Sequence, residues 1–462
     1  MKKDTIINEV IYKSFVDKIA QEFNVSYNAV GFHFKKIDDS GQNVSWFKSI
    51  TIFLVFPIYL LFLLLKKNSK VYKSDVTFED WRNDVEYDQN YRKIAEKLDK
   101  KVVKSRITLS NSPYTHDSLD SKNIQYMLNK NDYINKYVVV KTLLFIIKNI
   151  NIAIQLFSLN MEYKKSYIHF FSIILRSIII NHSIIKYANT KVYVTAYDIN
   201  AELLKYEIFK QYDVFFIIIQ SSIRGTNLTK YKAADILYCY GENQKDIYMA
   251  DNTSFKEVKC VGSTRNSNYL KSTNHNIKYD IFFPEQYVDF SHTTYASNQS
   301  YIKLLEHLIL LSKEYPMLNI VYKTRNKRGS KKCISIYNEV LDKLDKSGIE
   351  ICCDGNSYEM VRDSRLVIGY LSTLSFESIG IGTPSIFYYY DDFPIEVFDF
   401  KNSKNDILVL DSSYSAFKKA IFDSLDSDNH DAYFKKYKQI YMNQDQDIIN
   451  TICDDILNLI KD

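Results

Sequence analysis

The sequence contains few cysteines, and they form no recognisable pattern. The six are Cys239, Cys260, Cys333, Cys352, Cys353 and Cys453. They include no Cys-x-x-Cys pair and no Cys/His cluster with the spacing of metal ligands. Most lie in apolar runs, which favours buried free thiols in a reducing compartment over a disulfide framework.

A strong excess of charge is also missing. Sixty Lys and Arg residues face 55 Asp and Glu residues, which gives a formal net charge of +5. That balance is too mild and diffuse to indicate a nucleic-acid partner, although it suits an anionic ligand or anionic lipid headgroups. There is no tandem repeat or low-complexity tract, and we expect no cleavable signal because the first apolar block begins near residue 50.

The length and the rhythm of the chain predict two domains with appendages. A chain of 462 residues is too long for one core. Short apolar runs alternate with helical stretches, which indicates mostly parallel sheets with helices on both faces. These runs lie at 192–198, 214–220, 236–241, 258–263, 279–284, 319–324 and 349–354. Two apolar stretches before them, 137–159 and 168–186, carry polar stripes at helical spacing and predict largely buried helices.

Four segments follow from this pattern. Residues 1–85 are expected to form a helical N-terminal extension, and residues 86–270 a first Rossmann-like domain with a helical insert. A polar stretch separates it from a second Rossmann-like domain, residues 275–445. Residues 446–462 should form a helix that packs back across the two halves.

An apolar block at residues 50–65 indicates contact with a membrane. It contains no charge over sixteen residues, which is short of the ~20 that a full span needs. Pro57 near its middle favours a kink or an interfacial placement. Trp46 precedes the block, and Lys66 and Lys67 follow it, as anchors at a headgroup layer would. The alternative is a buried helix of a soluble domain. Between dipping into a membrane and spanning it, the sequence leaves both open.

The stretch from Arg362 to Phe393 predicts a strand–helix–strand unit that could hold a phosphate. An apolar run ends at Gly369, and a turn with Ser372 and Thr373 opens a helix that carries Glu377. Small hydroxyl residues at a helix start cap free N–H groups, and those groups with the helix dipole attract phosphate. The alternative is an ordinary capped crossover helix with an exposed glutamate.

This unit resembles the donor half of GT-B glycosyltransferases, and more narrowly of bacterial enzymes that build capsule, O-antigen and other surface polysaccharides. The resemblance covers roughly residues 192–390. It implies two Rossmann-like domains that face a cleft, with the donor phosphates near Gly369, Ser372 and Thr373, and with the donor ribose on Glu377. In such relatives a strand of the first half often ends in Gln-His-Gly. Here Gln220 is followed by two serines, so the histidine is missing and its role is in doubt.

Further cations and small residues stand where the resemblance places the donor. Gly262, Ser263 and Arg265 follow a strand at the expected cleft, where backbone N–H groups and a guanidinium could meet a phosphate. Lys323 and Arg325 close a strand of the second domain and would neutralise charge on a leaving nucleotide. The alternatives are a plain strand exit and a solvated basic loop.

Asp198 is the candidate general base for an attacking hydroxyl. It ends a strand of the first domain at the predicted cleft. Its alternative role is to cap the next helix. No Asp-x-Asp motif follows a suitable strand, so we expect metal independence and no cofactor beyond the nucleotide-sugar substrate.

The resulting hypothesis is a glycosyltransferase at the cytoplasmic face of the membrane. It would pass a sugar from a nucleotide-activated donor to a glycan or lipid-linked glycan during bacterial surface-polysaccharide assembly. The alternatives are a GT-B epimerase or hydrolase of the nucleotide sugar, and a catalytically degenerate scaffold of a polysaccharide assembly complex. Donor base, sugar and linkage stay open.

Overall fold

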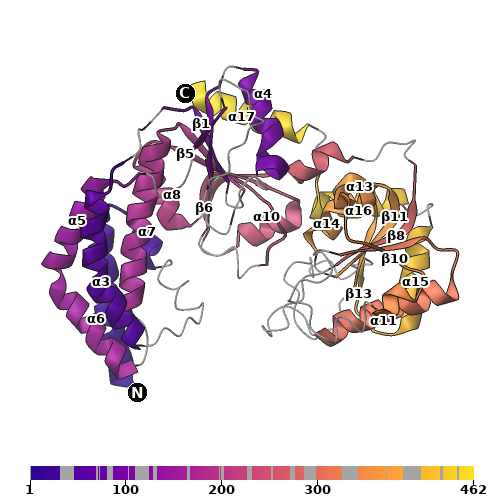
Figure 1. Cartoon of the computed structure of the whole chain (residues 1–462), viewed down its shortest axis with the longest axis horizontal. Coiled ribbons are helices and arrows are strands. Elements are labelled where there is room, and N and C mark those ends of the chain that lie inside the picture. The colour runs from indigo at the N-terminus through magenta and orange to yellow at the C-terminus, as the bar shows by residue number, and fades with distance from the viewer. Residues whose placement is uncertain are drawn as a thin grey trace.

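The computed structural model has two lobes, each built on a parallel sheet, with a bundle of helices at the outer end of the first (Figure 1). It describes residues 2–31, 46–68, 71, 73–80, 87–101, 103–109, 124–127, 133–163, 167–196, 198, 202–225, 232–250, 253–270, 276–285, 298–324, 342–370, 372–388, 407–426, 430–444 and 447–461.

The first lobe contains a seven-stranded sheet in the order β3-β2-β1-β4-β5-β6-β7, and every pairing is parallel. Its strands are β1 (Val76–Asp80), β2 (Ser105–Leu109), β3 (Ile124–Met127), β4 (Val192–Thr195), β5 (Phe215–Ile219), β6 (Ala233–Cys239) and β7 (Ser254–Cys260). The strand order reverses direction between β1 and β4, which are neighbours. Such a reversal is the switch point of a doubly wound sheet.

The second lobe repeats this plan with six parallel strands in the order β10-β9-β8-β11-β12-β13. They are β8 (Tyr279–Pro284), β9 (Ile320–Lys323), β10 (Glu350–Cys352), β11 (Ser364–Gly369), β12 (Ser385–Tyr388) and β13 (Leu408–Val409). Counted within the lobe, the order is 3-2-1-4-5-6, the order of a Rossmann domain. Its switch point lies between β8 and β11.

The helical bundle and one face of the first sheet share a hydrophobic core. The bundle consists of α1 (Lys2–Phe23), α3 (Trp46–Leu65), α5 (Lys136–Lys148), α6 (Ile150–Tyr163) and α7 (Tyr167–Ala188), and α8 (Leu203–Lys210) joins it to the sheet. Phe15 of α1 packs on Phe171 of α7 with ring centroids 5.0 Å apart. The N-terminal extension is therefore packed into the first lobe rather than separate from it.

Two features of the first lobe differ from the sequence-based expectation. The first sheet contains β1 to β3, so it begins before residue 86 and includes strands that were not predicted. The stretch 137–159 is broken into α5 and α6 at Asn149, whose Nδ2 donates to the Phe145 carbonyl at 2.9 Å. The described cysteines are free thiols, as expected; Cys239 and Cys453 are buried, the other three are half-buried, and Cys333 lies outside the described residues.

Among the described residues, no single helix is both long and apolar enough to cross a membrane, and the bent pair Lys136–Lys148 and Ile150–Leu156, which turns by 71°, passes that test only as a pair, by length and composition.

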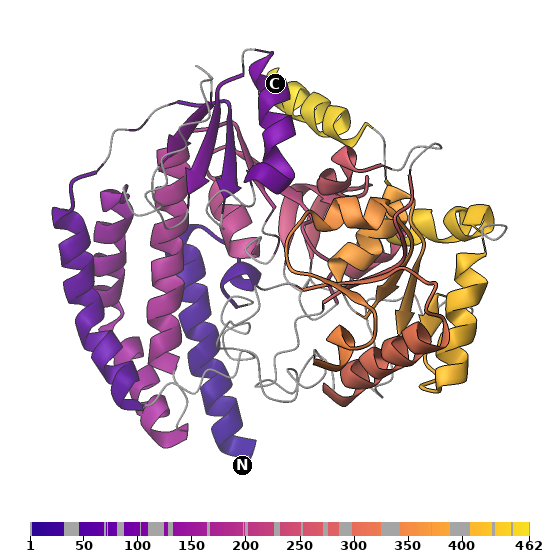
Figure 2. The same ribbon diagram turned by 45° about the vertical axis from the view of Figure 1, so that its right-hand side comes forward.

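The C-terminal helix α17 (Ile448–Lys461) returns to the first lobe after the chain has completed the second (Figure 2). Ile448, Ile452 and Ile456 pack with β1, β4 and β5 and with α4 (Arg92–Asp99). The other named helices are η1 (Tyr87–Tyr91), α10 (Glu242–Tyr248), η3 (Thr264–Asn268), α11 (Asn298–Glu314), α13 (Ser357–Arg362), α14 (Thr373–Ile381), α15 (Tyr414–Leu425) and α16 (His430–Tyr441). The chain thus crosses between the lobes twice.

Candidate functional site

The start of α14 lies at the switch point of the second sheet. β11 ends at Gly369 beside β8, and α14 begins at Thr373 with Ser372 as its N-cap. Both hydroxyl residues are half-buried, and the Ser372 side chain makes no capping hydrogen bond. In open α/β sheets, ligands bind beyond the carboxyl ends of the strands at such a point. The predicted phosphate cradle is therefore in the place where this topology puts a ligand.

Close packing explains the glycine that ends β11. A Cβ on Gly369 would lie 2.8 Å from the Ser375 Cβ and 2.8 Å from the Phe387 ring, closer than real Cβ atoms approach other groups. The glycine therefore lets the strand end come up against the first turn of α14. The helix ends at Gly382, whose φ of 104° is the left-handed conformation of a helix C-cap.

The start of α14 faces the first lobe. Thr373 Oγ1 accepts a hydrogen bond from the Ile223 backbone N–H at 3.3 Å. Ile223 belongs to the loop after β5, which Gln244 of α10 holds by accepting from the Arg224 N–H at 2.9 Å. Gln220 accepts from the Tyr240 N–H at 2.9 Å and fixes the start of the same loop. The stretch that replaces the Gln-His-Gly turn thus lies opposite the predicted donor site.

Glu377 is buried in a network that joins the lobes. Its Oε1 accepts from the Ser263 Oγ at 2.6 Å and lies 3.0 Å from Arg265 Nη2. Its Oε2 accepts from the Tyr358 hydroxyl at 2.7 Å, and the side chain is 1% exposed. Glu377 would have to release one of these donors to hold a ribose, so that role stays a prediction.

Arg265 is the cation of this network. Its Nη2 donates to the Tyr240 hydroxyl at 2.7 Å and to the Ser221 carbonyl, while its buried Nε has no hydrogen-bond partner. Burial alone would lower the pKa of Arg265, but the Glu377 carboxylate and Tyr240 raise it well above its ordinary value. Burial and the same carboxylate raise the pKa of Tyr358. The guanidinium therefore stays charged and paired.

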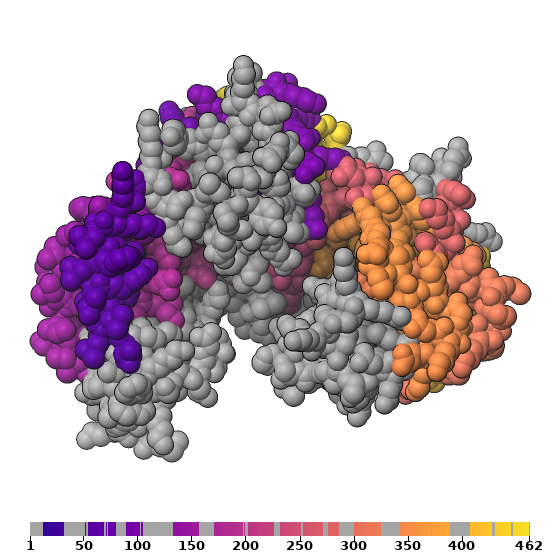
Figure 3. Space-filling model, in the orientation of Figure 1, coloured from indigo at the N-terminus to yellow at the C-terminus, as the bar shows by residue number. Residues whose placement is uncertain are grey.

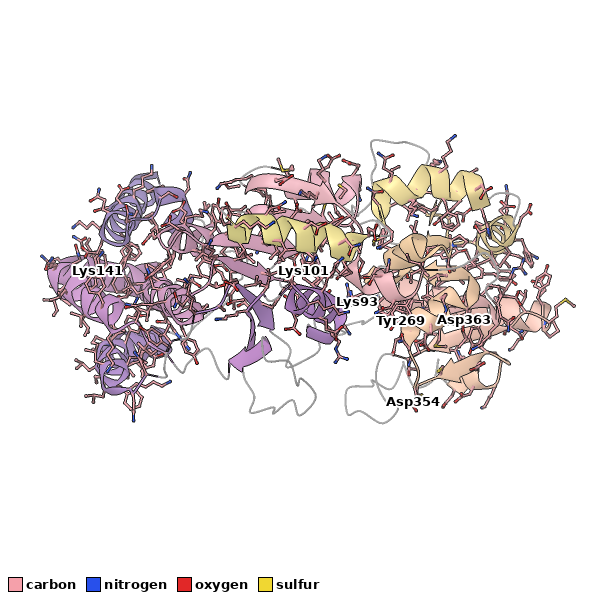
Figure 4. The ribbon with its side chains drawn as sticks, turned by 90° about the horizontal axis from the view of Figure 1, so that it is seen from above. Lys93, Lys101, Lys141, Tyr269, Asp354 and Asp363 are labelled. Atoms are coloured by element: carbon pink, nitrogen blue, oxygen red, sulfur yellow. The ribbon has the colours of Figure 1, made fainter. Side chains whose placement is uncertain are left out.

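The segment that carries Arg265 is held from several sides. Asn266 Nδ2 donates to the Glu377 backbone carbonyl at 2.9 Å and to Gln444 Oε1 at 3.1 Å. At the other end of η3, Tyr269 stacks on Tyr358 with ring centroids 5.2 Å apart. Figure 4 shows Tyr269 near the boundary between the lobes, close to Lys93 of α4. Lys93 Nζ donates to the Ser267 Oγ at 3.3 Å, so residues of both lobes grip this crossing.

Asp198 lies after β4, at the switch point of the first sheet, in an ion pair. Arg224 donates from Nη2 to Oδ1 at 2.6 Å and from Nε to Oδ2 at 2.7 Å, and the Tyr248 hydroxyl donates to Oδ2 as well. Burial alone would raise the pKa of Asp198, but Arg224 and Tyr248 hold it below its usual value. A carboxylate in this state is a weak base, and Asp198 as the general base stays a prediction that requires Arg224 to move.

The predicted basic edge of the second lobe is seen only in part. Lys323 is buried at the end of β9, and its Nζ donates to the Cys353 carbonyl at 2.8 Å. It therefore ties β9 to the loop after β10. Arg325 lies outside the described residues.

The structure brings Ser263, Arg265 and Glu377 into contact with one another, and places Gly262 beside them against Gln444. Ser372 and Thr373 lie at the start of the same helix as Glu377, whereas Asp198 and Lys323 sit in separate networks. Nothing in the sequence pointed to Tyr240, Tyr358 and Gln444, because isolated tyrosines and glutamines form no spacing pattern. Arg224 could have been found from the sequence, because it lies in the loop after β5 where related enzymes often carry a histidine.

Within the described residues, no group of three or more His, Cys, Asp or Glu side chains is placed to hold a metal ion. Metal independence stays a prediction, because it concerns the reaction and not this geometry.

No protein-family model matches the sequence, and no curated protein does. Solved structures do resemble it. A protein from Listeria monocytogenes described as a UDP-N-acetylglucosamine 2-epimerase has a TM-score of 0.51 at 11% identity, covering 84% of this chain and 97% of that one. The wall teichoic acid polymerase TagF has a TM-score of 0.49 at 11% identity, covering 94% and 98%. At this identity the epimerase likeness bears on the fold alone. Together with the two strand orders, it shows that the chain has the GT-B fold: two Rossmann-like domains joined by two crossings.

Proposed function

We propose that the protein is a glycosyltransferase that moves a sugar from a nucleotide-activated donor to a glycan acceptor in bacterial surface-polysaccharide biosynthesis. One observation carries this proposal. The N-terminus of α14, with Ser372 and Thr373, lies at the switch point of the second sheet and faces a fixed loop of the first lobe. An anion held there would lie between the two lobes, where an acceptor can reach it.

The start of α14 suits a sugar diphosphate. The first backbone N–H groups of a helix have no partner within it, and the helix dipole adds positive potential there. With the hydroxyls of Ser372 and Thr373, these groups would stabilise charge that develops on the phosphate oxygen as the bond to the sugar breaks. In the proposed reaction the acceptor oxygen forms the new bond to the sugar carbon, and its proton passes to a base. Amides and hydroxyls can supply this stabilisation, so we propose a reaction that needs no metal.

Asp198 is the proposed base, and its pairing sets a condition. While Arg224 binds both carboxylate oxygens, Asp198 has low proton affinity. Donor binding between the lobes would have to draw Arg224 toward the phosphates to free the carboxylate. The same movement would place a second cation at the leaving group.

We propose that the acceptor is a lipid-linked glycan and that the enzyme works at the inner face of the cell membrane. This proposal rests on the apolar block 50–65, which forms α3. The proposed donor site lies between the two lobes, so donor binding can be measured without an acceptor.

A nucleotide screen tests the donor site. Uridine, cytidine and guanosine diphosphates and their sugar conjugates are added to the full chain, and thermal unfolding is measured. A ligand that binds the native state raises the melting temperature by an amount set by its affinity and concentration. Ser372→Ala should weaken binding of the active class by roughly tenfold or more, the effect of losing a hydrogen bond to a charged group.

Ser413→Ala is the matched control. Ser413 is the N-cap of α15 in the same lobe, and its Oγ accepts from the Ala416 N–H at 3.3 Å. Losing that cap should cost about 1 kcal/mol of stability and leave nucleotide affinity unchanged. No stabilisation by any nucleotide, or equal binding by both variants, would refute the proposed donor site.

Two alternative functions can be told apart from glycosyl transfer by what happens to the donor. A nucleotide-sugar epimerase or hydrolase would change the donor without any acceptor. The Listeria protein is described as such an epimerase. A degenerate scaffold would bind without turnover. NMR of the donor after incubation, with and without a membrane extract as acceptor source, separates the three.

A further inference from the structure

The helical bundle leaves an apolar stripe of α3 uncovered. Leu54, Ile58, Leu61, Phe62 and Leu65 follow one another at helical spacing, and each is between 55% and 83% exposed. The opposite side of the same helix is buried in the bundle core through residues that include Phe56 and Leu60. A helix that is apolar all round normally has both sides covered, by core or by lipid.

α5 continues this apolar surface. Tyr137, Val140, Leu144 and Ile147 form a stripe that is 43% to 73% exposed, while Val138, Val139 and Phe145 on the other side are buried. Ile150 and Ile154 extend it onto α6. Most of the large apolar side chains that are exposed among the described residues lie on these three helices. Monomeric proteins rarely expose a contiguous apolar surface of this extent without a partner.

The two stripes lie next to each other. Asn68, just after α3, and Ile134, just before α5, exchange two hydrogen bonds of 2.8 Å, from Asn68 Nδ2 to the Ile134 carbonyl and from the Ile134 N–H to Asn68 Oδ1. The end of α3 is thereby fixed to the start of α5, and the two helices are in contact. Figure 3 shows α3 in indigo on the near side of the bundle, with the magenta side chains of its neighbours beside it.

The charges on α3 and α5 are of one sign. Exposed lysines stand at their ends: Lys67 and Lys136 where α3 meets α5, and Lys148 at the far end of α5. Neither α3 nor α5 contains an aspartate or a glutamate. Tyr137 is 73% exposed and follows Lys136 at the start of α5. Tyrosine rings are common at membrane interfaces.

We propose that the exposed stripes of α3, α5 and α6 form one docking surface that lies on an anionic lipid bilayer. Each helix keeps one side in the protein core. The exposed side would therefore insert only to the boundary between headgroups and acyl chains, as in interfacial helices. Lysines at its ends contact acidic headgroups. A second copy of the chain would bring lysines and no counter-charge from α3 and α5, which is why lipid is the favoured occupant. This inference deepens the membrane location proposed above but does not depend on the proposed reaction, so vesicle binding and nucleotide binding can fail independently.

Vesicle co-sedimentation of the full chain tests it. The vesicles are phosphatidylcholine alone, or phosphatidylcholine with about a quarter phosphatidylglycerol. The protein should sediment with the anionic vesicles and less with the neutral ones. Lys67→Gln with Lys136→Gln should lower partitioning onto the anionic vesicles by roughly thirtyfold, because each lysine near such a surface contributes on the order of 1 kcal/mol.

The apolar contribution is tested helix by helix. Ile58→Ser with Phe62→Ser changes α3, and Leu144→Ser with Ile147→Ser changes α5. The four changes together should lower partitioning by about a hundredfold or more. Leu310→Ser with Leu410→Ser, two apolar residues of the second lobe that are 48% and 59% exposed, is the matched control and should leave binding within about twofold. All variants change exposed positions, and thermal unfolding checks that they fold.

Three outcomes would overturn the inference. The protein could stay in the supernatant with both kinds of vesicle. The α5 variant could bind as tightly as the wild type, which would reduce the surface to α3 alone. Sedimentation velocity without lipid could show a dimer that the four changes convert to a monomer, which would assign the surface to a second copy.

Discussion

The Oγ of Ser263 lies 2.6 Å from Oε1 of Glu377, although 114 positions separate the two residues. One stands on the crossing between the lobes, and the other on the helix whose start forms the proposed donor site. The motif that suggested nucleotide binding is therefore also part of the joint that sets how the lobes meet.

Glu377→Gln should lower both stability and donor affinity. The amide keeps the shape of the carboxylate but loses the charge that Arg265 pairs with at 3.0 Å. We expect the free energy of unfolding in urea to fall by about 3–5 kcal/mol, because the change leaves the buried Arg265 guanidinium without a counter-charge. Calorimetric donor affinity should fall roughly tenfold if Glu377 also reaches the ribose. Glu359→Gln, at an exposed position of α13, should change neither quantity. Full donor affinity in Glu377→Gln would remove Glu377 from the donor site.

Asp198→Asn separates a catalytic from a structural role. The change leaves the buried Arg224 guanidinium without a counter-charge, which costs on the order of 3–5 kcal/mol of stability. Adding Arg224→Met should restore much of that stability. If Asp198 is the base, the stable double variant should still transfer sugar more slowly by about a hundredfold to ten-thousandfold. Because Arg224 is the proposed second cation, Arg224→Met alone is measured alongside. Near wild-type turnover in Asp198→Asn itself would leave Asp198 with its structural role only.

Gly262→Ala should loosen the joint. Gly262 has a φ of 85°, and a Cβ there would lie 2.6 Å from Gln444 Oε1 and 2.7 Å from Gln444 Cα. Backbone strain and overpacking together should cost about 2–5 kcal/mol. Gly348→Ala is the control, since its φ is 83° but nothing lies within 4 Å of the added carbon. The control should show the backbone cost alone, about 1–2 kcal/mol. Equal losses in the two variants would mean that the linker can shift away from Gln444.

His182 makes the stability of the helical bundle depend on pH. Burial, helped by the charge of Lys141, lowers the pKa of His182 to about 4, and its Nδ1 lies 2.9 Å from the Tyr212 hydroxyl. The unfolded chain takes up this proton near pH 6.5, before the folded one does. The neutral ring therefore supports the fold fully above pH 6.5, and this support is lost as the pH falls toward 4.

Between pH 7 and pH 5 the wild type should lose about 2 kcal/mol more stability than His182→Gln. Urea unfolding of both proteins at the two pH values measures it. Parallel pH dependence in the two proteins would contradict the lowered pKa.

The sequence predicted the fold class, and the likeness in fold to the Listeria protein confirms it. Most strands from β4 onward were predictable, because they are apolar runs that parallel sheets bury on both faces. The exceptions are β7, which begins at Ser254 before the predicted run 258–263 and is exposed or half-buried throughout, and β13, which was not predicted. β1 was missed because it carries Glu79, a buried charge that looks like a surface residue in one dimension. Its partner is Lys205, whose Nζ lies 2.8 Å from Glu79 Oε2 and which is 126 positions away. Long-range pairing of this kind leaves no local signal.

The same reasoning explains what was found and missed at the site. The turn at Ser372 and the glycine before it follow local rules of helix starts and close packing, so they could be read directly. That Arg265 would pair with Glu377 depends on how two separately predictable lobes meet. That Arg224 would pair with Asp198 depends on how the loops after β4 and β5 of the first lobe approach each other. Spacing within one chain does not encode that meeting.

The two crossings between the lobes also lie against each other. The amide oxygen of Gln444 accepts from the Ser263 N–H at 3.1 Å, and Asn443 Nδ2 donates to the Cys260 carbonyl at 3.0 Å. Two connecting segments held together at one place resist sliding and separation of the lobes but still permit a hinge rotation. If the lobes rotate relative to each other, these contacts would place the pivot at Ser263, Gln444 and Asn443, at one edge of the boundary between the lobes.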